Sequence, residues 1–423
     1  MNKTKETFLT AFTLFSLFFG AGNLILPPFL GYNSDNEWLL TTIGFSLSAV
    51  LIPIIGIYAH AKLQGTMIDF AKKISPAFSI AYCSIVYLIS ISIPSPRTAS
   101  VTYEMAIAPY FDTSPLTTSI VYFALVFVFV INRSRIIDLV GKFLTPFILI
   151  ILLSIIGVSL FSESTVGTNP SYKHPFSSGF LEGYQTFDAI AAVVVGAVII
   201  ISINTRSSAS YSEKRKLISK AGILAGIGLL IIYAGLIYTG AMSASLFGND
   251  PTRSALLNGI AKKTLGNAGN LLLSILVSLA CFTTAVGIVT GTSDYVKKLY
   301  RNSDNAYYIT AALGCILGIL IGQYEVGFII DVAIPALMFI YPITIVLIIL
   351  NALPDKYTSN SVFKKVVGIT ILFSIPDFIN ALGFYKHISS WSQLIPLSQY
   401  QLGWVIPSLT VLIISNCVKK TAD

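Results

Sequence analysis

Long apolar runs separated by short polar segments dominate this chain of 423 residues. A helix needs about 20 mainly apolar residues to cross the hydrocarbon core of a bilayer. Twelve runs are close to that length, at residues 8–30, 38–59, 78–108, 117–131, 138–161, 179–203, 217–243, 268–294, 305–322, 326–350, 365–384 and 400–417. The pattern predicts an all-α integral membrane protein with twelve transmembrane helices, in which residues 1–423 form a single membrane domain.

The distribution of positive charge supports this assignment. Cytoplasmic loops near membrane spans are enriched in Lys and Arg. If the N-terminus lies inside, 21 of the 27 Lys and Arg residues fall on the inner side and five on the outer side, while Arg97 lies within a span. One missed or added helix would exchange the sides of every later loop. The sustained bias therefore predicts twelve spans, with both termini in the cytoplasm.

A polar loop at residues 162–178 divides five spans from seven. Because five is odd, a second five-helix unit would enter the membrane from the opposite side, as in transporters built from inverted repeats. The predicted units are residues 8–161 and 179–350, followed by two extra helices within 365–417. The two units show no visible sequence identity, so this prediction rests on topology.

Composition and the scatter of polar groups argue against several classes of function. Charged residues make up 11% of the chain, against about 25% in soluble domains. The four cysteines show no paired spacing and the three histidines are isolated, so neither a disulfide framework nor a zinc site is expected. There is no phosphate-binding loop, and the positive charge lies mainly in predicted inner loops, so no nucleic-acid partner is expected. A channel would need a repeated filter, and an intramembrane enzyme would need a nucleophile–base pair or an acidic metal cluster; we find neither pattern.

The N-terminus has a second interpretation. Lys3 and Lys5 precede an apolar stretch and small residues, as in a secretory signal peptide. The apolar run continues past Gly22, however, and cleavage would remove the most unusual motif of the chain. We therefore expect residues 8–30 to be a membrane span.

That motif interrupts the first predicted span. It reads Phe19-Gly20-Ala21-Gly22-Asn23-Leu24-Ile25-Leu26-Pro27-Pro28. Each proline lacks an N–H and frees a carbonyl, and glycine lets the backbone approach a ligand closely. One interpretation is a kink that serves only helix packing. The other is a binding site, in which amides at the start of the second half-helix hold a carboxylate. Freed carbonyls and the Asn23 side-chain oxygen would then coordinate a cation.

The sixth predicted span contains a second irregularity. Its start reads Glu182-Gly183-Tyr184-Gln185-Thr186-Phe187-Asp188-Ala189, and the clean apolar run begins only at Ala189. In a five-helix repeat this span corresponds to the first, and paired discontinuities are typical of inverted-repeat transporters. An aspartate within a span is costly unless it is paired or functional. Asp188 is therefore either a site residue or the cap of the following helical segment, and the two roles are compatible.

The eighth predicted span contains Ala280-Cys281-Phe282-Thr283-Thr284. Its two hydroxyls are neutral oxygen ligands of the kind that hard cations prefer. The alternative is that each hydroxyl bonds to a carbonyl three or four residues earlier in the same helix. Tyr and Phe residues are plentiful elsewhere in the spans, and we interpret them as lipid-facing or core residues.

Further ionisable groups lie within predicted spans. Arg97, in the segment Pro94-Ser95-Pro96-Arg97-Thr98 of the third span, needs a counter-ion. Glu104 lies on the same helix face, but about 10 Å further along the axis, which disfavours direct pairing. Both a structural ion pair and a substrate or gating role stay open for Arg97. Asp331, Asp377 and Glu325 are expected at interfaces or as helix caps.

Together these motifs resemble a known family. Residues 19–28, Pro94-Ser-Pro-Arg-Thr-Ala99, Gly183-Tyr-Gln-Thr-Phe-Asp-Ala189 and Gly141-Lys-Phe-Leu-Thr-Pro146 are similar to motifs of bacterial branched-chain amino acid:cation symporters, the BrnQ-type carriers. The likeness covers nearly the whole chain. These carriers are related to the amino acid–polyamine–cation superfamily, which has the leucine-transporter fold. The resemblance implies a 5+5 inverted repeat plus two C-terminal helices. It also implies sodium-driven import of leucine, isoleucine and valine across the bacterial cytoplasmic membrane.

The resemblance also implies site residues where the motifs match. The implied substrate-binding residues are Gly20, Ala21, Gly22, Asn23 and, from a looser match in the sixth helix, Gln185, Thr186, Phe187, Asp188 and Ala189. Asn23 and the Phe18 carbonyl would border one cation. The second cation would be bordered by carbonyls of Ser16, Phe19 and Ala280 and by the hydroxyls of Thr283 and Thr284. No catalytic residues and no cofactor are implied, apart from sodium as the coupling ion.

Proton coupling is the alternative. Some superfamily members place a lysine of the fifth helix where sodium would sit, and Lys142 begins the fifth predicted span, close to its cytoplasmic edge. The chain would then be a proton-coupled carrier of another small amino acid or solute, acting through Lys142 or Asp188. The expected partners are the small-molecule substrate and the lipid bilayer, and the sequence predicts no oligomeric state.

Overall fold

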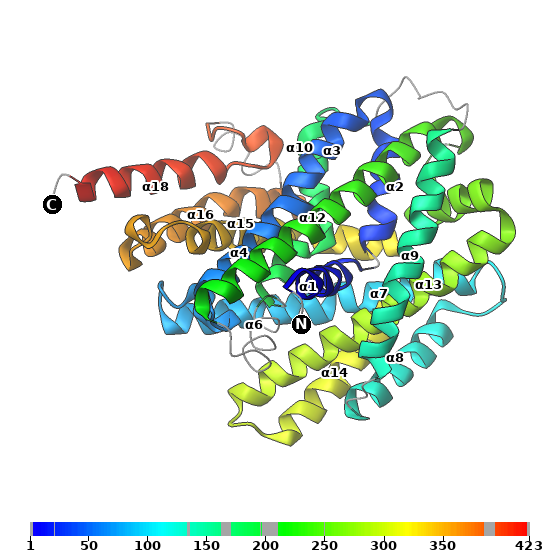
Figure 1. Ribbon diagram of the computed structural model, residues 1–423, viewed down its shortest axis with the longest axis horizontal. Helices are drawn as coiled ribbons and strands as arrows, with labels where there is room; N and C mark the ends of the chain where they lie inside the picture. The colour runs from blue at the N-terminus through cyan, green and yellow to red at the C-terminus, as the bar shows by residue number, and fades with distance from the viewer. Residues whose placement is uncertain are drawn as a thin grey trace.

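The computed structural model describes residues 3–20, 22–132, 136–161, 171–194, 196, 210–248, 250–384 and 394–420. Within these residues every regular element is helical (Figure 1). The first part of the chain forms α1 (Lys3–Phe18), α2 (Gly22–Ser34), α3 (Trp38–Ser46), α4 (Ile52–Leu63), α5 (Met67–Ala71), α6 (Pro76–Ser92), α7 (Pro94–Thr102), α8 (Pro115–Asn132) and α9 (Ile136–Leu160). The rest forms α10 (Pro175–Glu182), α12 (Tyr211–Met242), α13 (Arg253–Leu299), α14 (Asp304–Gly322), α15 (Val326–Ala352), α16 (Asn360–Ala381) and α18 (Val405–Lys420). The prediction of an all-α protein is confirmed.

Seven helical segments are long and apolar enough to cross a membrane within the described residues. They are Gly22–Leu63, Pro76–Ile107, Pro115–Asn132, Tyr211–Met242, Arg253–Leu299, Asp304–Gly322 and Val326–Ala352. Large apolar side chains are exposed along the helices, among them Leu88, Ile150 and Ile413 at 61%, 61% and 62%. Soluble monomers rarely expose apolar surface on this scale, whereas lipid tails would cover it. The count of twelve spans and the two repeats stay predictions.

The start of the eighth predicted span differs from the prediction. α13 begins at Arg253 and kinks at Gly266, where φ is 72° and ψ is −174°. Glycine tolerates such a backbone conformation because it lacks a Cβ. The arm before the kink buries Leu257 and Ile260, while polar residues such as Lys262 occupy other positions. Because this arm is amphipathic, its apolar residues do not form a continuous run, and the apolar pattern therefore did not predict it.

Helices α2 and α12 pack with their backbones in direct contact. A Cβ on Gly31 would overlap the carbonyl of Ile237, and a Cβ on Gly240 would overlap the carbonyl of Pro28. Small residues allow helix backbones to approach closely where lipid removes the hydrophobic driving force. The two glycines therefore set the distance between these helices.

Helices α3 and α10 meet in the same manner. A Cβ on Gly44 would overlap the carbonyl of Phe176, and a Cβ on Gly179 would overlap the carbonyl of Thr41. α2, α3, α10 and α12 pack together in the upper part of the molecule as drawn, while α16 and α18 form one edge (Figure 1).

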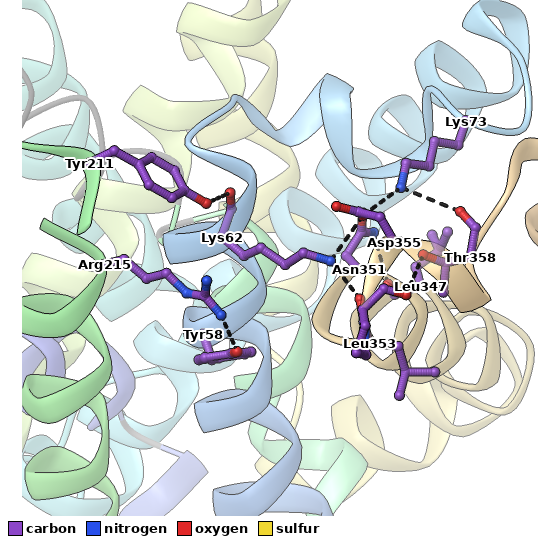
Figure 2. Close-up of polar contacts among 11 residues, drawn as sticks. Tyr58, Lys62, Lys73, Tyr211, Arg215, Leu347, Asn351, Leu353, Asp355 and Thr358 are labelled. Atoms are coloured by element: carbon purple, nitrogen blue, oxygen red, sulfur yellow. Dashed lines mark hydrogen bonds and ion pairs between the residues drawn. The ribbon is translucent and has the colours of Figure 1, made fainter.

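The end of α4 is tied to two other parts of the chain (Figure 2). The hydroxyl of Tyr211, at the start of α12, donates to the carbonyl of Lys62 at 2.7 Å. The Lys62 ammonium donates to the carbonyl of Leu353 and to Asp355 Oδ1, the latter at 3.0 Å. Asp355 lies in the short η6 (Asp355–Tyr357) between α15 and α16. The hydrogen bond from Lys62, with the charges of Lys62 and Lys73, lowers the pKa of this carboxyl group.

Changing Gly31 to Ala should destabilise the protein by about 1–3 kcal/mol, because the added methyl group meets backbone atoms of α12 that cannot move aside. Thermal unfolding of the purified protein in detergent measures the effect. Gly368→Ala is the matched control, since a Cβ at this exposed position in α16 meets nothing within 4 Å. Equal unfolding temperatures for the two variants would contradict the backbone contact.

Candidate functional site

The first predicted interruption is confirmed. α1 ends at Phe18 and α2 begins at Gly22, with Phe19 and Gly20 outside both helices. The amide of Gly20 donates to the carbonyl of Phe18 at 3.0 Å, and the amide of Asn23 donates to the carbonyl of Gly20 at 3.1 Å. Ala21 lies outside the described residues. Pro27 and Pro28 lie inside α2, so the break itself lies at the glycine-containing segment.

The second interruption is also present. α10 ends at Glu182 and continues as the 3₁₀ turn η4 (Gly183–Thr186), after which helix resumes at residues 188–194. Phe187 joins the two parts in a left-handed conformation with φ of 62° and ψ of 11°. A side-chain-bearing residue in this region costs about 1–3 kcal/mol and is typical of functional sites. A Cβ on Gly183 would overlap the Ser48 hydroxyl, so a larger residue here would require Ser48 to shift.

A buried hydrogen-bond network joins the two interruptions. Asn23 Nδ2 donates to Asp188 Oδ2 at 2.7 Å and also contacts the hydroxyl of Tyr233. The Tyr233 hydroxyl donates to the same carboxylate oxygen at 3.2 Å. Asn23, Asp188 and Tyr233 are at most 2% exposed. The side chain of Asp188 therefore connects the first break to the second, and it is held there by α12.

This network bears on the interpretations of Tyr233 and Asp188. The Tyr233 ring lies in a buried apolar cluster, as expected for a core residue, while its hydroxyl belongs to the polar network, a role of which its apolar neighbours gave no signal. The Asp188 carboxylate bonds to Asn23 and Tyr233, while the first amide of the resumed helix, that of Asp188 itself, donates to the hydroxyl of Thr186 at 3.2 Å. Thr186 thus contacts the helix start, and the Asp188 side chain is directed to the first break.

Arg97, on α7, lies between the same two breaks. Its Nη1 donates to the carbonyl of Gln185 at 2.9 Å, and its guanidinium carbon lies 5.4 Å from the centre of the Phe187 ring. A Cβ on Gly22 would lie 3.1 Å from that guanidinium carbon. Glycine at position 22 therefore leaves the space that Arg97 occupies beside the start of α2.

Glu104 serves a different contact. It lies in η3 (Tyr103–Ile107), accepts a hydrogen bond from the hydroxyl of Ser254, and accepts another from the backbone amide of Val326 at 2.8 Å. The structure does not bring it to Arg97, in agreement with their separation along the helix. Lys142 lies on α9, and its side chain is outside the described residues.

Thr284 of α13 lies close to the first break, and its neighbour Thr283 shares its local hydrogen-bond acceptor. The hydroxyls of Thr283 and Thr284 donate to the carbonyl of Ala280 at 3.0 and 2.8 Å, as the back-bonding alternative predicted. A hydroxyl that donates its proton still has lone pairs for a further partner. A Cβ on Gly20 would lie 3.8 Å from both Thr284 Oγ1 and Asn23 Oδ1. The structure thus places oxygens of α2 and α13 around the same glycine.

Other predicted residues surround this centre. Phe18, Phe19 and Ala280 belong to one buried apolar cluster. The Ser16 hydroxyl accepts a hydrogen bond from Thr145 at 2.9 Å. Ala189 is fully buried, and Gln185 Oε1 is buried with no hydrogen-bond partner among the described residues.

The chain matches the model of a protein family described as branched-chain amino acid transport protein, over residues 3–422. The chain belongs to this family. The family consists of transport proteins, so the chain is not an enzyme. It is 33% identical to the branched-chain amino acid permease BraB of Bacillus subtilis, with 97% of this chain and 94% of that permease covered. It is 30% identical to the branched-chain amino acid permease BrnQ of Escherichia coli, with 98% and 95% covered.

Solved structures show the fold of this family member. The structure resembles the inward-facing conformation of Mhp1 with a TM-score of 0.62 at 13% identity, covering 98% of this chain and 91% of that one. It resembles MhsT, solved in complex with L-phenylalanine, with a TM-score of 0.58 at 15% identity, covering 97% of each chain. These likenesses confirm the leucine-transporter-like fold.

The shared carboxylate of Asp188 predicts energetic coupling between its two donors. Tyr233→Phe and Asn23→Ala each remove one hydrogen bond to a buried charged group, which costs about 1.5–3 kcal/mol. Because both act on one oxygen, the double variant should differ from the sum of the single variants by about 0.5–3 kcal/mol. Thermal or denaturant unfolding in detergent measures this cycle.

Tyr307→Phe provides the control for this cycle. Its buried hydroxyl donates to the Val130 carbonyl at 2.9 Å, in a different apolar cluster. The effects of Tyr307→Phe and Asn23→Ala should add. Additive effects of Tyr233→Phe and Asn23→Ala would argue against the shared carboxylate.

Proposed function

We propose that this protein is a sodium-coupled symporter that imports branched-chain amino acids by alternating access. The observation that carries the proposal is the meeting of two broken helices at the buried Asn23–Asp188 hydrogen bond of 2.7 Å. Irregular backbone at membrane depth is tolerated where protein buries it or where it lines a cavity. Discontinuous helices in corresponding positions of two halves are typical of transporter binding sites. The permeases BraB and BrnQ, which are named for branched-chain amino acids, support the substrate class.

The proposed substrate site lies between the breaks. Amides at the start of α2 would hold the carboxylate of the amino acid, because helix N-termini favour anions. Carbonyls of both breaks and the Asp188 carboxylate would receive the ammonium group, and Phe187 with the third span would contact the aliphatic side chain. The proposed substrate-binding residues are Gly20, Ala21, Gly22, Asn23, Gln185, Thr186, Phe187, Asp188 and Ala189.

The proposed sodium ligands lie on the other side of the first break. They are oxygens of Ser16, Phe18, Phe19, Asn23, Ala280, Thr283 and Thr284. The nearness of Thr284 Oγ1 and Asn23 Oδ1 to Gly20 supports this placement. Asn23 would then border both the cation and the amino acid. This shared residue would let bound sodium stabilise one conformation of the carrier. Sodium could do so because a ligand with different affinities for two states shifts their equilibrium.

The paired helix contacts support two inverted repeats. In a five-helix repeat the first span corresponds to the sixth and the second to the seventh. The half of the first span before its break, α1, packs against α12 of the seventh span, and the half of the sixth span before its break, α10, packs against α3 of the second span. Exchanging the two repeats exchanges these two contacts. The same pairing is expected if α1 and α10 are equivalent half-helices.

A bacterial cytoplasmic membrane with both termini inside is the proposed location. The surplus of Lys and Arg in alternate loops supports this orientation. Lys62, Lys73 and Arg215 lie close together at one end of the helices (Figure 2), which would be the cytoplasmic end.

Proton coupling is the second candidate, and the position of Asp188 favours it. A carboxyl group that is 1% exposed at the meeting point of both breaks is placed to exchange a proton as the site opens and closes. Ionisable residues within membrane spans commonly serve proton relays.

Uptake of labelled leucine into proteoliposomes tests the proposed function. We expect accumulation when an inward sodium gradient is imposed, and little when a proton gradient replaces it. Uptake driven by protons alone would replace sodium with the second candidate. Absence of leucine, isoleucine and valine uptake under either gradient would reject the substrate class.

Thr284→Ala tests the proposed cation site. Removal of one neutral oxygen ligand should raise the sodium concentration for half-maximal uptake about tenfold, which corresponds to about 1.4 kcal/mol. Leucine affinity at saturating sodium should change little. Thr292→Ala is the matched control, because Thr292 makes the same back-bond on the same helix, to the carbonyl of Ile288 at 2.9 Å. Equal effects on sodium and leucine would argue against a separate cation site.

A further inference from the structure

Arg97 is a buried positive charge whose partner in the described residues is a backbone carbonyl. It is 3% exposed, and its Nη1 donates to the carbonyl of Gln185 at 2.9 Å. A guanidinium group has five N–H donors. Burying an ion without a counter-charge costs several kcal/mol even after the surroundings relax. Arg97 is therefore suited to a partner of opposite charge that arrives from outside the protein.

The acids near Arg97, and Glu104 further along its own helix, are committed to other groups. Asp188 accepts hydrogen bonds from Asn23 and Tyr233. Glu104 accepts from Ser254 and from the amide of Val326. The third acid, Glu182, lies 3.6 Å from a guanidinium nitrogen of Arg253. Within the described part of the chain, none of these carboxylates forms an ion pair with Arg97.

The surroundings of Arg97 suit the binding of a carboxylate. The guanidinium lies beside Gly22, the first residue of α2, where a Cβ would be 3.1 Å from its central carbon. The amides at a helix start carry partial positive charge, so a carboxylate between them and Arg97 would meet positive groups on two sides. The planar fork of arginine fits a carboxylate through two parallel hydrogen bonds. On the adjoining break, Gln185 Oε1 is buried without a partner among the described residues, and as an acceptor it would suit the ammonium group of the same amino acid.

Asp188 supplies the opposite charge in the same site. Both side chains reach the space between the breaks, Arg97 from α7 and Asp188 from the resumed sixth span. An α-amino acid carries its carboxylate and its ammonium on one carbon, so a positive and a negative protein group near each other recognise both ends. A compound without the carboxylate would leave Arg97 uncompensated.

We propose that Arg97 binds the α-carboxylate of the transported amino acid, together with the amides at the start of α2. This inference rests on the proposed function, because it names the group that makes the site selective for amino acids over amines and amides. Gly22 then has a definite role, which is to keep the guanidinium close to the helix start.

Competition between leucine and leucinamide tests this inference. Leucinamide keeps the ammonium group and the aliphatic side chain but replaces the carboxylate with a neutral amide. Binding of labelled leucine to the purified protein, displaced by each compound, gives both affinities. The wild type should prefer leucine strongly, and Arg97→Gln should lose about 100-fold in leucine affinity, as expected when one partner of a buried charge pair is removed. Its leucinamide affinity should change less than about threefold.

Two further variants sharpen the result. Arg97→Lys keeps the charge but not the fork, and it should fall between the wild type and Arg97→Gln; it replaces Arg97→Gln if that variant does not fold. Arg253→Gln removes the other arginine near the breaks and should leave the preference for leucine over leucinamide unchanged. Equal losses of leucine and leucinamide in folded Arg97 variants would assign Arg97 a purely structural or gating role and overturn the proposal.

The outcome also separates this inference from the proposed function. A wild type that binds another α-amino acid but not leucine, isoleucine or valine would reject the substrate class. Loss of that amino acid's preference over its amide in Arg97→Gln would still support the carboxylate role. A wild type that binds no α-amino acid overturns both.

Discussion

The central constraint on this structure is that backbone polar groups need partners when water is absent. An unsatisfied amide or carbonyl in an apolar environment costs several kcal/mol, so a helix surrounded by apolar residues rarely stops without compensation. Within the described residues, this chain interrupts two helices, at Phe19 and Gly20 and at residues 183–187. Local hydrogen bonds offset part of this cost: the amide of Gly20 donates to the carbonyl of Phe18, and the amide of Phe187 donates to the carbonyl of Tyr184. Arg97 satisfies another part by bonding to Gln185.

The side chains that compensate the breaks also define what the site can do. Asn23 and Asp188 hydrogen-bond to each other across the two breaks, so each is the partner that the other requires when buried. With Tyr233, they bring a carboxylate, an amide and a phenol together beside a buried apolar cluster. Arg97 adds the opposite charge a short distance away. The polar groups that join the two breaks are therefore the same groups that would recognise a zwitterion.

Much of this arrangement is visible in the sequence, and the remainder has a physical reason for being hidden. Glycines and polar residues inside apolar runs revealed both breaks, because such residues destabilise a membrane-spanning helix unless they have a structural or binding role. Tyr233 was missed because a tyrosine in an apolar run is equally suited to a core, and only the fold places its hydroxyl beside Asp188. The arm of α13 before Gly266 was missed because amphipathic helices lack a continuous apolar run. The partner of Arg97 could not be predicted, since it is a carbonyl from another span.

The glycine contacts between α2 and α12, and between α3 and α10, have a mechanical consequence. A helix whose surface fits against a neighbour's carbonyls cannot turn about its own axis without driving side chains into that backbone. The two helices of each pair are therefore expected to move together as one rigid body. A large displacement of α2 or α10 would carry its partner helix along, and the non-helical residues Phe19, Gly20 and Phe187 are the points next to these helices where the chain could bend. These few residues lie directly beside the groups that would hold the cargo.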